Sequence, residues 1–567
     1  MAKINLTFAD SGKTLVCEAG IKISDVLNNF GASVPLVAVK ANNQLVPLTD
    51  TLGVNTILEA VPLGSDTGLQ IYKRTLMFLF TFAAHNVLPD RKVFIGHSLG
   101  SAYFYNLIGA KKISEGEAAL LKNEMLRLIK EDLAITFKRI TFREALDYFT
   151  KCDRPETTVL LEQRSRANVS VNVCKNIDNK NCNGNKEYID LYIWPLLTST
   201  GMIKAFDVVK YESGVLLRYP AKENINEVGE FSDLGDFIDS KKIFSVYTEN
   251  KNWGRTVNIY SVCQLNRLVT DRSVKDFISI NEAFQAKKLS NIADKISQKK
   301  DKIKLILIAG PSSSGKTTTA KRLLIQLKVV GIDPIPVSLD DYYLHPSKAP
   351  KDENGKPDLE CLEALDVPYL NKQLIALFNG EEITLPRFDF KTGVRMEGER
   401  IKLGKHQVLV LEGIHGLNDK LTSQIAVDNK FKIYVSALTQ LNIDEHNNIS
   451  STDNRILRRM VRDNQFRGTS AAKTIDMWPS VQDGAEKHIF KFQNNADAVF
   501  NSALDYEIAV LKYYADPLLR GVKPDTPEYA EASRLLYFLE NFAPIPPQYV
   551  PGDSILREFI GESDFKY

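Results

Sequence analysis

Apolar and polar residues alternate in short runs through the first sixty positions. These runs are Ile4–Phe8, Lys13–Cys17, Leu36–Lys40 and Thr56–Val61. A period of two residues predicts β-strands, and one helical stretch near Lys22–Phe30 interrupts them. We therefore predict a small β-grasp-like module over residues 1–62.

The apolar pattern then lengthens. An apolar helix is predicted over Leu69–His85, and it opens a second, α+β unit over residues 63–225. Residues 226–284 give a mixed pattern and are expected to form a connecting region.

The C-terminal half shows a third pattern. A helix rich in Lys, Ala and Ile is predicted near Glu282–Lys302, and it leads into the apolar run Ile303–Ala309. That run is typical of a buried strand in a parallel sheet. Apolar strands and amphipathic helices then alternate to Tyr567, which predicts a doubly wound α/β domain over residues 285–567.

Composition restricts the class of protein. The 567 residues are 44% hydrophobic and 25% charged, with a formal net charge of +2, so the chain is globular and is not a polycation. Its six cysteines form no CxxC pair, which argues against zinc ribbons and a disulfide scaffold. No apolar run reaches the ~18 residues of a membrane span. A cytoplasmic protein with reduced thiols and no membrane partner is expected.

The first chemical motif is Gly310–Thr317, which fits GxxxxGK[ST]. A Gly/Ser turn would satisfy the letters alone, but an apolar strand precedes the motif and a helix-forming stretch follows it. That context favours a phosphate-binding loop, with Lys316 on the β- and γ-phosphates of ATP and Thr317 on Mg²⁺. The candidate nucleotide-binding residues are Gly310, Ser312, Ser313, Ser314, Gly315, Lys316, Thr317 and Thr318.

Carboxylates follow two further apolar runs. Asp340 and Asp341 end the run that begins at Ile335, and Glu412 ends Val408–Leu411. Ligand groups collect at the carboxyl ends of strands in open α/β sheets. Position alone does not decide between a general base at Asp340 and a solvated turn. Glu412 suits the Mg²⁺ shell.

Together these motifs resemble the uridine kinase and phosphoribulokinase family. The resemblance extends in order through Leu365–Pro368, Pro386–Phe390 and Arg455–Gly468, and it covers roughly residues 300–510. It implies that Asp340 is the general base on the acceptor hydroxyl, that Thr317 and Glu412 surround Mg²⁺, and that Asp366 binds sugar hydroxyls. The substrate-binding residues it implies are Asp340, Tyr343, Asp366, Arg387, Phe388 and Arg395.

An arginine-rich helix completes the resemblance. The spacing of Arg455, Arg458, Arg459 and Arg462 places them on one helix face. In the family this helix closes as a lid whose arginines neutralise the transferring phosphoryl group, whereas composition alone would also fit a solvated basic helix. The expected catalytic residues are Lys316, Asp340, Arg458, Arg462 and Arg467.

Two departures concern the acceptor. Uridine kinases usually have Tyr-Asp-Phe followed by a histidine, whereas this chain has Phe388–Phe390 and then Gly393. The hydroxyl and the imidazole that would bond a pyrimidine are therefore missing, and their loss relaxes or redirects the choice of acceptor. Uridine is the leading expectation for the acceptor and no more.

The N-terminal half carries two weaker resemblances. Ala38–Val46 and the strand spacing resemble a TGS domain, while Lys92–Tyr105 and Asp190–Phe206 resemble the editing domain of threonyl-tRNA synthetase. The ligand-type side chains of that domain are absent, and the matching positions hold Arg74, Phe78, Tyr192, Trp194 and Leu196. Editing hydrolysis is therefore not expected, although the scaffold can still present a nucleotide-shaped cleft.

Two other signals have ordinary interpretations. Gly96–Gly100 satisfies GxSxG, but the aromatic run after it does not resemble the helix of a nucleophile elbow. His415 follows Glu412-Gly413, and a structural histidine explains it better than a catalytic one.

These patterns predict an ATP- and Mg²⁺-dependent kinase that acts on a small-molecule hydroxyl, with a nucleoside as the leading acceptor. The alternative is a protein that binds tRNA or another RNA and whose P-loop gates that binding. The N-terminal modules then either regulate the kinase or form an inert appendage. Oligomeric state stays open.

Overall fold

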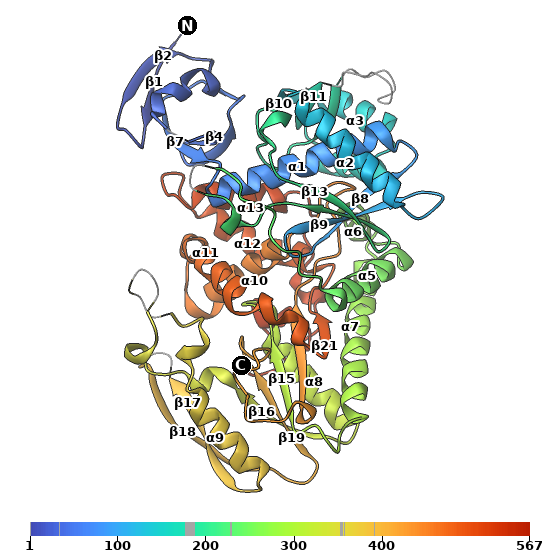
Figure 1. Ribbon diagram of the computed structural model, residues 1–567, viewed down its shortest axis with the longest axis vertical. Helices are drawn as coiled ribbons and strands as arrows, with labels where there is room; N and C mark the ends of the chain where they lie inside the picture. The colour runs from blue at the N-terminus through green and yellow to red at the C-terminus, as the bar shows by residue number, and fades with distance from the viewer. Residues whose placement is uncertain are drawn as a thin grey trace.

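The computed structural model describes residues 2–32, 34–175, 187–226, 229–351, 355, 358–389 and 392–567. The chain forms an elongated body, with the N-terminal modules at one end and a parallel sheet at the other (Figure 1). The C-terminal helices lie between them. Cys182 and Phe390 fall outside the described residues.

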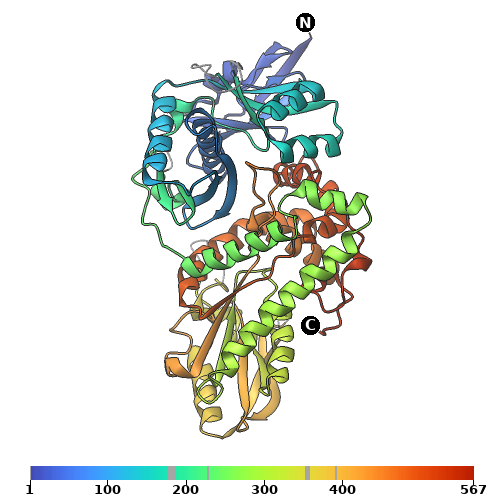
Figure 2. The ribbon, with the colours of Figure 1, turned by 90° about the vertical axis from the view of Figure 1, so that its right-hand side faces the viewer.

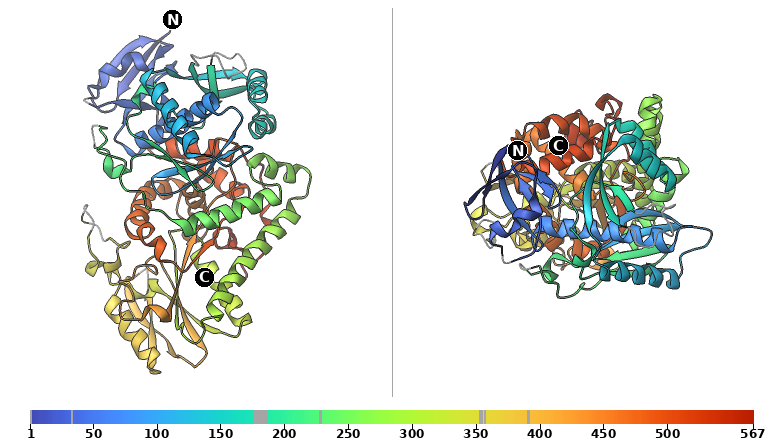
Figure 3. Two further views of the ribbon diagram at one scale, coloured as in Figure 1. Left: turned by 45° about the vertical axis from the view of Figure 1, so that its right-hand side comes forward. Right: turned by 90° about the horizontal axis from the view of Figure 1, so that it is seen from above.

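A five-stranded sheet forms the first module, in the order β2-β1-β7-β4-β5. Its elements are β1 (Lys3–Phe8), β2 (Thr14–Glu18), β4 (Leu36–Ala41), β5 (Gln44–Pro47), β7 (Thr56–Pro62), the small pair β3 (Ile21–Lys22) and β6 (Thr51–Leu52), and a 3₁₀ helix over Ile23–Phe30. Leu6, Phe8 and Leu58 are among its buried residues. The predicted strands and the helical interruption are confirmed. This module lies at the end of the molecule away from the parallel sheet (Figure 3).

The second unit is α+β. The apolar helix α1 (Asp66–Val87) packs beside α2 (Glu115–Lys130). One sheet has the order β13-β14-β9-β8 and another has the order β10-β11-β12. The strands are β8 (Lys92–Ser98), β9 (Ala102–Ile108), β10 (Ile135–Thr141), β11 (Asn168–Lys175), β12 (Glu187–Leu191), β13 (Asp207–Tyr211) and β14 (Gly214–Arg218), with helices α3 (Phe142–Lys151) and α4 (Pro155–Arg164).

Three helices connect the halves. They are α5 (Lys241–Thr256), α6 (Val262–Thr270) and α7 (Val274–Ser297), the last running as one long rod to the parallel sheet (Figure 2). The helix expected from Glu282 begins earlier, at Val274, and ends at Ser297. The division placed between residues 284 and 285 therefore falls inside a continuous helix.

The parallel sheet has the strand order β16-β19-β15-β20-β21. Its strands are β15 (Leu305–Ala309), β16 (Asp333–Ser338), β19 (Gln407–Glu412), β20 (Lys430–Ser436) and β21 (Ala498–Asn501). All pairings in it are parallel. Helices α8 (Lys316–Val329) and α9 (Val367–Phe378) and the hairpin β17 (Glu382–Asp389) and β18 (Val394–Lys402) complete this part. The doubly wound α/β prediction is confirmed.

The remaining helices are α10 (Ser451–Arg467), α11 (Ala471–His488), α12 (Glu507–Arg520), α13 (Tyr529–Leu539) and α14 (Arg557–Ile560). Helix α10 packs against α11, α12 and α14. Most of its side chains are buried, including Ile456, Leu457, Met460 and Val461. The helix expected to close as a lid is therefore part of the core in this structure, because apolar residues on several of its faces need partners.

One segment joins the kinase half to the N-terminal half. Residues 440–449, between β20 and α10, lie against β8: Ile95 donates from its backbone nitrogen to the Glu445 carbonyl at 2.9 Å. The amide of Asn442 donates back to the Ile95 carbonyl at 2.8 Å. We call residues 440–449 the docking segment, because they join the kinase half to the N-terminal half.

Candidate active site

A glycine-rich loop connects the buried strand β15 to helix α8. Gly315 has φ +80°, and Ser313 also adopts a positive φ of 60°. A Cβ on Gly310 would collide with the Val435 carbonyl, so the loop follows this path only with glycine there. Its backbone N–H groups then precede the N-terminus of α8, which favours an anion.

The side chains expected on ATP and Mg²⁺ meet around this loop. The Thr317 hydroxyl donates to Oε1 of Glu412 at 3.2 Å, which brings the ends of α8 and β19 together. The Lys316 ammonium donates to the Pro311 carbonyl at 3.3 Å. Burial lowers the pKa of Lys316, and the nearby carboxylates of Glu412 and Asp340 partly oppose that shift. Burial, assisted by Asp340, raises the pKa of Glu412 to about 7.

The loop fits a phosphate ligand. The hydroxyls of Ser313 and Ser314 are buried and have no hydrogen-bond partner among the described residues. Buried donors rarely persist without a partner, because each costs about 1–3 kcal/mol of folding free energy. In the described part of the chain, no group of three or more His, Cys, Asp or Glu side chains is placed to hold a metal ion. A magnesium ion here would therefore take Thr317, Glu412, phosphate oxygens and water, which is the usual mixture for Mg²⁺.

The paired acids after β16 have different environments. Asp341 accepts a hydrogen bond from the backbone nitrogen of Phe388 at 3.0 Å and so holds β17 in place. Asp340 makes no such contact through its carboxylate among the described residues. Burial raises the pKa of Asp340, and the Lys316 charge opposes this shift. Of the two alternatives at this position, a general base or a solvated turn, these environments favour a reactive acid at Asp340. Asp341 has an anchoring role.

Arginines of α10 contact the phosphate loop. Arg455 donates to the Ser312 carbonyl at 2.9 Å, and Arg459 donates to the Ser312 hydroxyl at 2.8 Å. Arg462 and Arg467 both pair with Asp463, at 3.0 and 3.4 Å. The charge of Arg462 lowers the pKa of Lys316, and that of Arg467 lowers the pKa of Asp340, so both guanidinium groups lie near the site.

Arg458 is placed differently from the other arginines. It is completely buried and pairs with Glu507 at 2.5 Å. Its remaining donors go to backbone carbonyls of Ser313 and Ser502, at 3.3 and 2.8 Å. With its donors used beneath the loop, this guanidinium supports the loop and does not face a substrate. The catalytic role expected for Arg458 thus stays a prediction, while its donors in this structure bind Glu507, Ser502 and the loop.

The residues expected on the acceptor side form one cluster. Asp366 caps α9 by accepting from the Tyr369 nitrogen at 3.1 Å, and its other oxygen pairs with Arg395 at 3.0 Å. Arg395 also donates to the carbonyls of Tyr342 and Tyr343, both at 3.2 Å. The rings of Tyr343 and Phe388 lie 6.1 Å apart. Arg387 is exposed on β17. Asp366, which the family resemblance assigns to the sugar, is thus already paired. A sugar hydroxyl would have to share its carboxylate oxygens with Tyr369 and Arg395.

Two further acids lie at this site, and no sequence pattern indicated either of them. The pKa of Glu360 is raised by burial and lowered by the charges of Lys316 and Arg459, which places it near both. Glu558 of α14 accepts hydrogen bonds from the backbone nitrogen and the hydroxyl of Thr318, at 3.1 and 2.6 Å. A carboxylate therefore occupies a backbone donor predicted to bind nucleotide. Residues 240 positions apart share no local pattern, so only the fold could bring them together.

The editing-like positions of the N-terminal half form no open cleft. Arg74, Phe78, Trp194 and Leu196 line a space of about 30 Å³, which has room for a water molecule or two. His446 and Asn447 of the docking segment line the same space. A nucleotide-sized space is therefore absent at these described positions, where large side chains and the docking segment leave little room.

The structure agrees with the ordinary interpretation of the GxSxG run, and the one for His415 stays a prediction. Ser98 ends β8 and a tight turn leads to β9, so no helix follows the GxSxG run as a nucleophile elbow requires. His415 is buried, and burial lowers its pKa to about 4, so it is neutral. The five described cysteines are free thiols. Within the described residues, no helix combines the length and the apolarity needed to cross a lipid bilayer.

Comparison with known proteins divides the chain in the same way. The profile of the Phosphoribulokinase / Uridine kinase family matches residues 305–509. A uridine kinase of Halobacterium salinarum is 30% identical over 193 residues, which are 34% of this chain and 77% of that enzyme. A solved structure described as a possible uridine kinase from Bacillus stearothermophilus is 21% identical, with a TM-score of 0.26, and covers 38% of this chain and 100% of that one.

The N-terminal region has a different relative. A threonine–tRNA ligase of Streptococcus suis is 25% identical over 209 residues, which are 36% of this chain and 30% of that enzyme. The predicted fusion of a kinase with synthetase-like modules is confirmed.

Proposed function

Because this chain belongs to the phosphoribulokinase / uridine kinase family, we propose that it transfers the γ-phosphate of ATP to a hydroxyl of a nucleoside-like acceptor. The observation that carries the proposal is the Asp340 carboxylate, which lies close to Lys316 at the carboxyl edge of the sheet and, unlike Asp341, anchors no backbone group among the described residues. A protein that only senses nucleotide needs no such base. This argues against the alternative in which the P-loop merely gates RNA binding.

In the proposed mechanism, Asp340 accepts the proton of the attacking hydroxyl. Its raised pKa favours that role, since a carboxylate is a better base as its pKa approaches the working pH. Lys316 stabilises negative charge on the transferring phosphoryl group, and the site that lowers its pKa excludes the water that would weaken this interaction. Thr317 and Glu412 would hold Mg²⁺, which supplies charge neutralisation between the phosphates when bound.

Two arginines complete the proposed catalytic group. Arg462 and Arg467 have free donors beyond their bonds to Asp463, and both lie near the reacting end of the loop. Arg458 acts through Ser313 and Ser502, so we assign it a positioning role beneath the loop.

The acceptor site favours a sugar hydroxyl carried on an aromatic group. The tilted rings of Tyr343 and Phe388 offer an apolar surface for a base, and Asp366 with Arg395 offers a charged pair for ribose hydroxyls. Phe388 and Gly393 themselves lack the tyrosine hydroxyl and the imidazole that would bond a pyrimidine, and the rings of Tyr343 and His345 lie beside them. We therefore propose a nucleoside kinase with relaxed preference for the base.

The test is to incubate the full chain with ATP, Mg²⁺ and a panel of nucleosides and sugars, and to measure phosphorylated product. The same assay is run on Asp340→Asn and on Asp341→Asn. Asn at 340 is expected to lower turnover by ~10²–10⁴-fold with little change in ATP affinity, the usual contribution of a positioned base. Asn at 341 keeps an acceptor for the Phe388 nitrogen and is expected to retain most turnover. If Asp340→Asn loses ATP binding instead, Asp340 is a metal ligand.

A further inference from the structure

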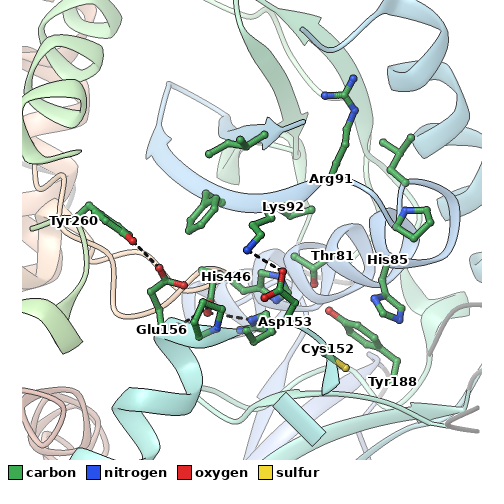
Figure 4. A pocket seen from close by; sticks show the side chains of 18 of the residues that line it. Thr81, His85, Arg91, Lys92, Cys152, Asp153, Glu156, Tyr188, Tyr260 and His446 are labelled. Atoms are coloured by element: carbon green, nitrogen blue, oxygen red, sulfur yellow. Dashed lines mark hydrogen bonds and ion pairs between the residues drawn. The ribbon is translucent and has the colours of Figure 1, made fainter. Parts of the chain in front are cut away.

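A second cavity lies between the synthetase-like unit and the kinase half, away from the phosphate loop. Its volume is about 440 Å³, far larger than the space of about 30 Å³ at the editing-like positions. Several elements of both halves form its walls. Among them, β8 supplies Lys92, the start of α4 supplies Glu156, the turn before α6 supplies Tyr260, and the docking segment supplies His446 (Figure 4). A cavity of this size holds a nucleotide-sized molecule.

The charged lining has a positive excess. Five cationic residues line the cavity against three acidic ones: Arg91, Lys92, Arg154, Lys251 and Arg255, with Asp153, Glu156 and Glu445. The acids are already engaged. Glu445 pairs with Arg154 at 3.1 Å. It also accepts hydrogen bonds from the backbone nitrogens of Glu156 and Thr157, at 2.9 and 3.2 Å. Glu156 accepts from the Tyr260 hydroxyl at 3.0 Å (Figure 4).

Two of the cations are available to a ligand. Within the described residues, Arg255 makes no ion pair and no side-chain hydrogen bond. Lys92 pairs with Asp153 at 2.8 Å, but the two side chains are 53% and 73% exposed, so that pair is worth little. An incoming anion can therefore recruit both cations without breaking a buried interaction.

The rest of the wall is apolar and aromatic. Phe94, Tyr148, Tyr188 and Tyr260 line the cavity together with the aliphatic residues Leu88, Val93 and Ile108. Aromatic faces beside available cations are suited to a flat ring that carries a negatively charged group. We propose that this cavity binds a nucleotide-sized aromatic phosphate ester, with its phosphate near Lys92 and Arg255 and its ring against the aromatic wall.

The cavity also has a short route to the phosphate loop. Glu445 and His446 of the docking segment form part of its wall. Helix α10 begins shortly after them along the chain, at Ser451, and its Arg455 donates to the Ser312 carbonyl of the loop. We propose that a ligand bound to these residues changes the affinity of the loop for nucleotide through the docking segment. By linkage such a coupling acts in both directions.

The binding test uses the full chain and the probes AMP, GMP, CMP and UMP, each measured by calorimetry beside its nucleoside and inorganic phosphate. The variant is Lys92→Ala/Arg255→Ala. The matched control is Lys130→Ala/Arg143→Ala, which removes two exposed cations outside the cavity. We expect at least one monophosphate to bind to the wild type and the control, and to bind about tenfold or more weakly to the variant, because its phosphate loses both charged partners.

Equal affinity in all three proteins would place the monophosphate elsewhere, for example in the acceptor site, and would overturn the proposal. No binding to the wild type would overturn it as well. Binding of inorganic phosphate alone would overturn the aromatic part of the assignment.

The coupling is tested by binding a non-hydrolysable ATP analogue with Mg²⁺, with and without a saturating monophosphate. We expect a change in analogue affinity in the wild type that is lost in Lys92→Ala/Arg255→Ala. No change in the wild type would overturn the coupling. Neither measurement requires turnover, so failure of the kinase proposal would leave both results interpretable.

Discussion

The phosphate loop and the Arg154 network are both buried and polar, yet they differ in how completely their groups are paired. In the loop, the Ser313 and Ser314 hydroxyls have no partner among the described residues. Around Arg154, by contrast, one guanidinium meets Asp190 at 3.3 Å, Asp444 at 3.6 Å and Glu445 at 3.1 Å.

The difference indicates what each region is for. Unpaired donors at the end of a buried strand are costly unless a ligand completes them, so the loop is built for an anion. The Arg154 network is complete without a ligand, and its acids come from both halves of the chain. It therefore holds the two halves together.

Lys316→Ala is expected to have the largest effect, and it tests whether the loop binds a phosphate. In the proposed mechanism the ammonium stabilises charge on the transferring phosphoryl group. We therefore expect kcat/KM for phosphoryl transfer to fall by about 10³-fold or more, with an unchanged unfolding temperature. Lys328→Ala, on the exposed face of the same helix, is the control. Turnover at the wild-type rate in Lys316→Ala would refute the phosphate-loop assignment.

Arg154→Ala tests the other region. It leaves Asp444, Glu445 and Asp190 buried without their cation, so we expect a loss of about 3–5 kcal/mol in the free energy of unfolding. Chemical denaturation followed by circular dichroism measures it, with the exposed Arg143→Ala as control. A loss below about 1 kcal/mol, the range of a surface pair, would show that the network does not hold the halves together.

A smaller effect is expected at Glu558, because this acid pairs with donors at the end of the phosphate loop. Its carboxylate occupies the Thr318 donors that an ATP phosphate would need. Removing that charge in Glu558→Gln should lower the KM for ATP by about threefold to tenfold, the difference between a charged and a neutral hydrogen bond. Glu562→Gln, exposed on the same segment, controls for the loss of a carboxylate. A raised KM would mean that Glu558 supports the loop.

The smallest expected effect depends on pH. Burial, followed by the neighbouring Glu445, raises the pKa of Glu156 from 4.5 to about 8. The folded state therefore holds this proton more tightly than the unfolded state, and the stability it contributes is lost as pH rises from about 4.5 through about 8. Glu156→Gln cannot ionise, so its unfolding temperature should exceed that of the wild type by a few degrees at about pH 9 and match it near pH ~5. Parallel curves would contradict this assignment.

Local sequence was enough for much of the kinase site. The strand at Leu305–Ala309, the glycine loop and the start of α8 are contiguous, so their chemistry could be predicted from spacing and strand–helix context. The edge positions of Asp340 and Glu412 followed from the parallel sheet, because the carboxyl ends of its strands meet on one side.

Tertiary structure alone decided the rest. Helical spacing placed Arg455, Arg458, Arg459 and Arg462 on one face. It could not show that Arg458 would pair with the buried Glu507, or that Arg462 would lie near Lys316. Glu558 reaches Thr318, and Glu445 reaches Arg154, across hundreds of residues. Periodicity and motif spacing report on neighbours within a few turns of chain, whereas the pairing of buried charges depends on which distant elements the fold brings into contact.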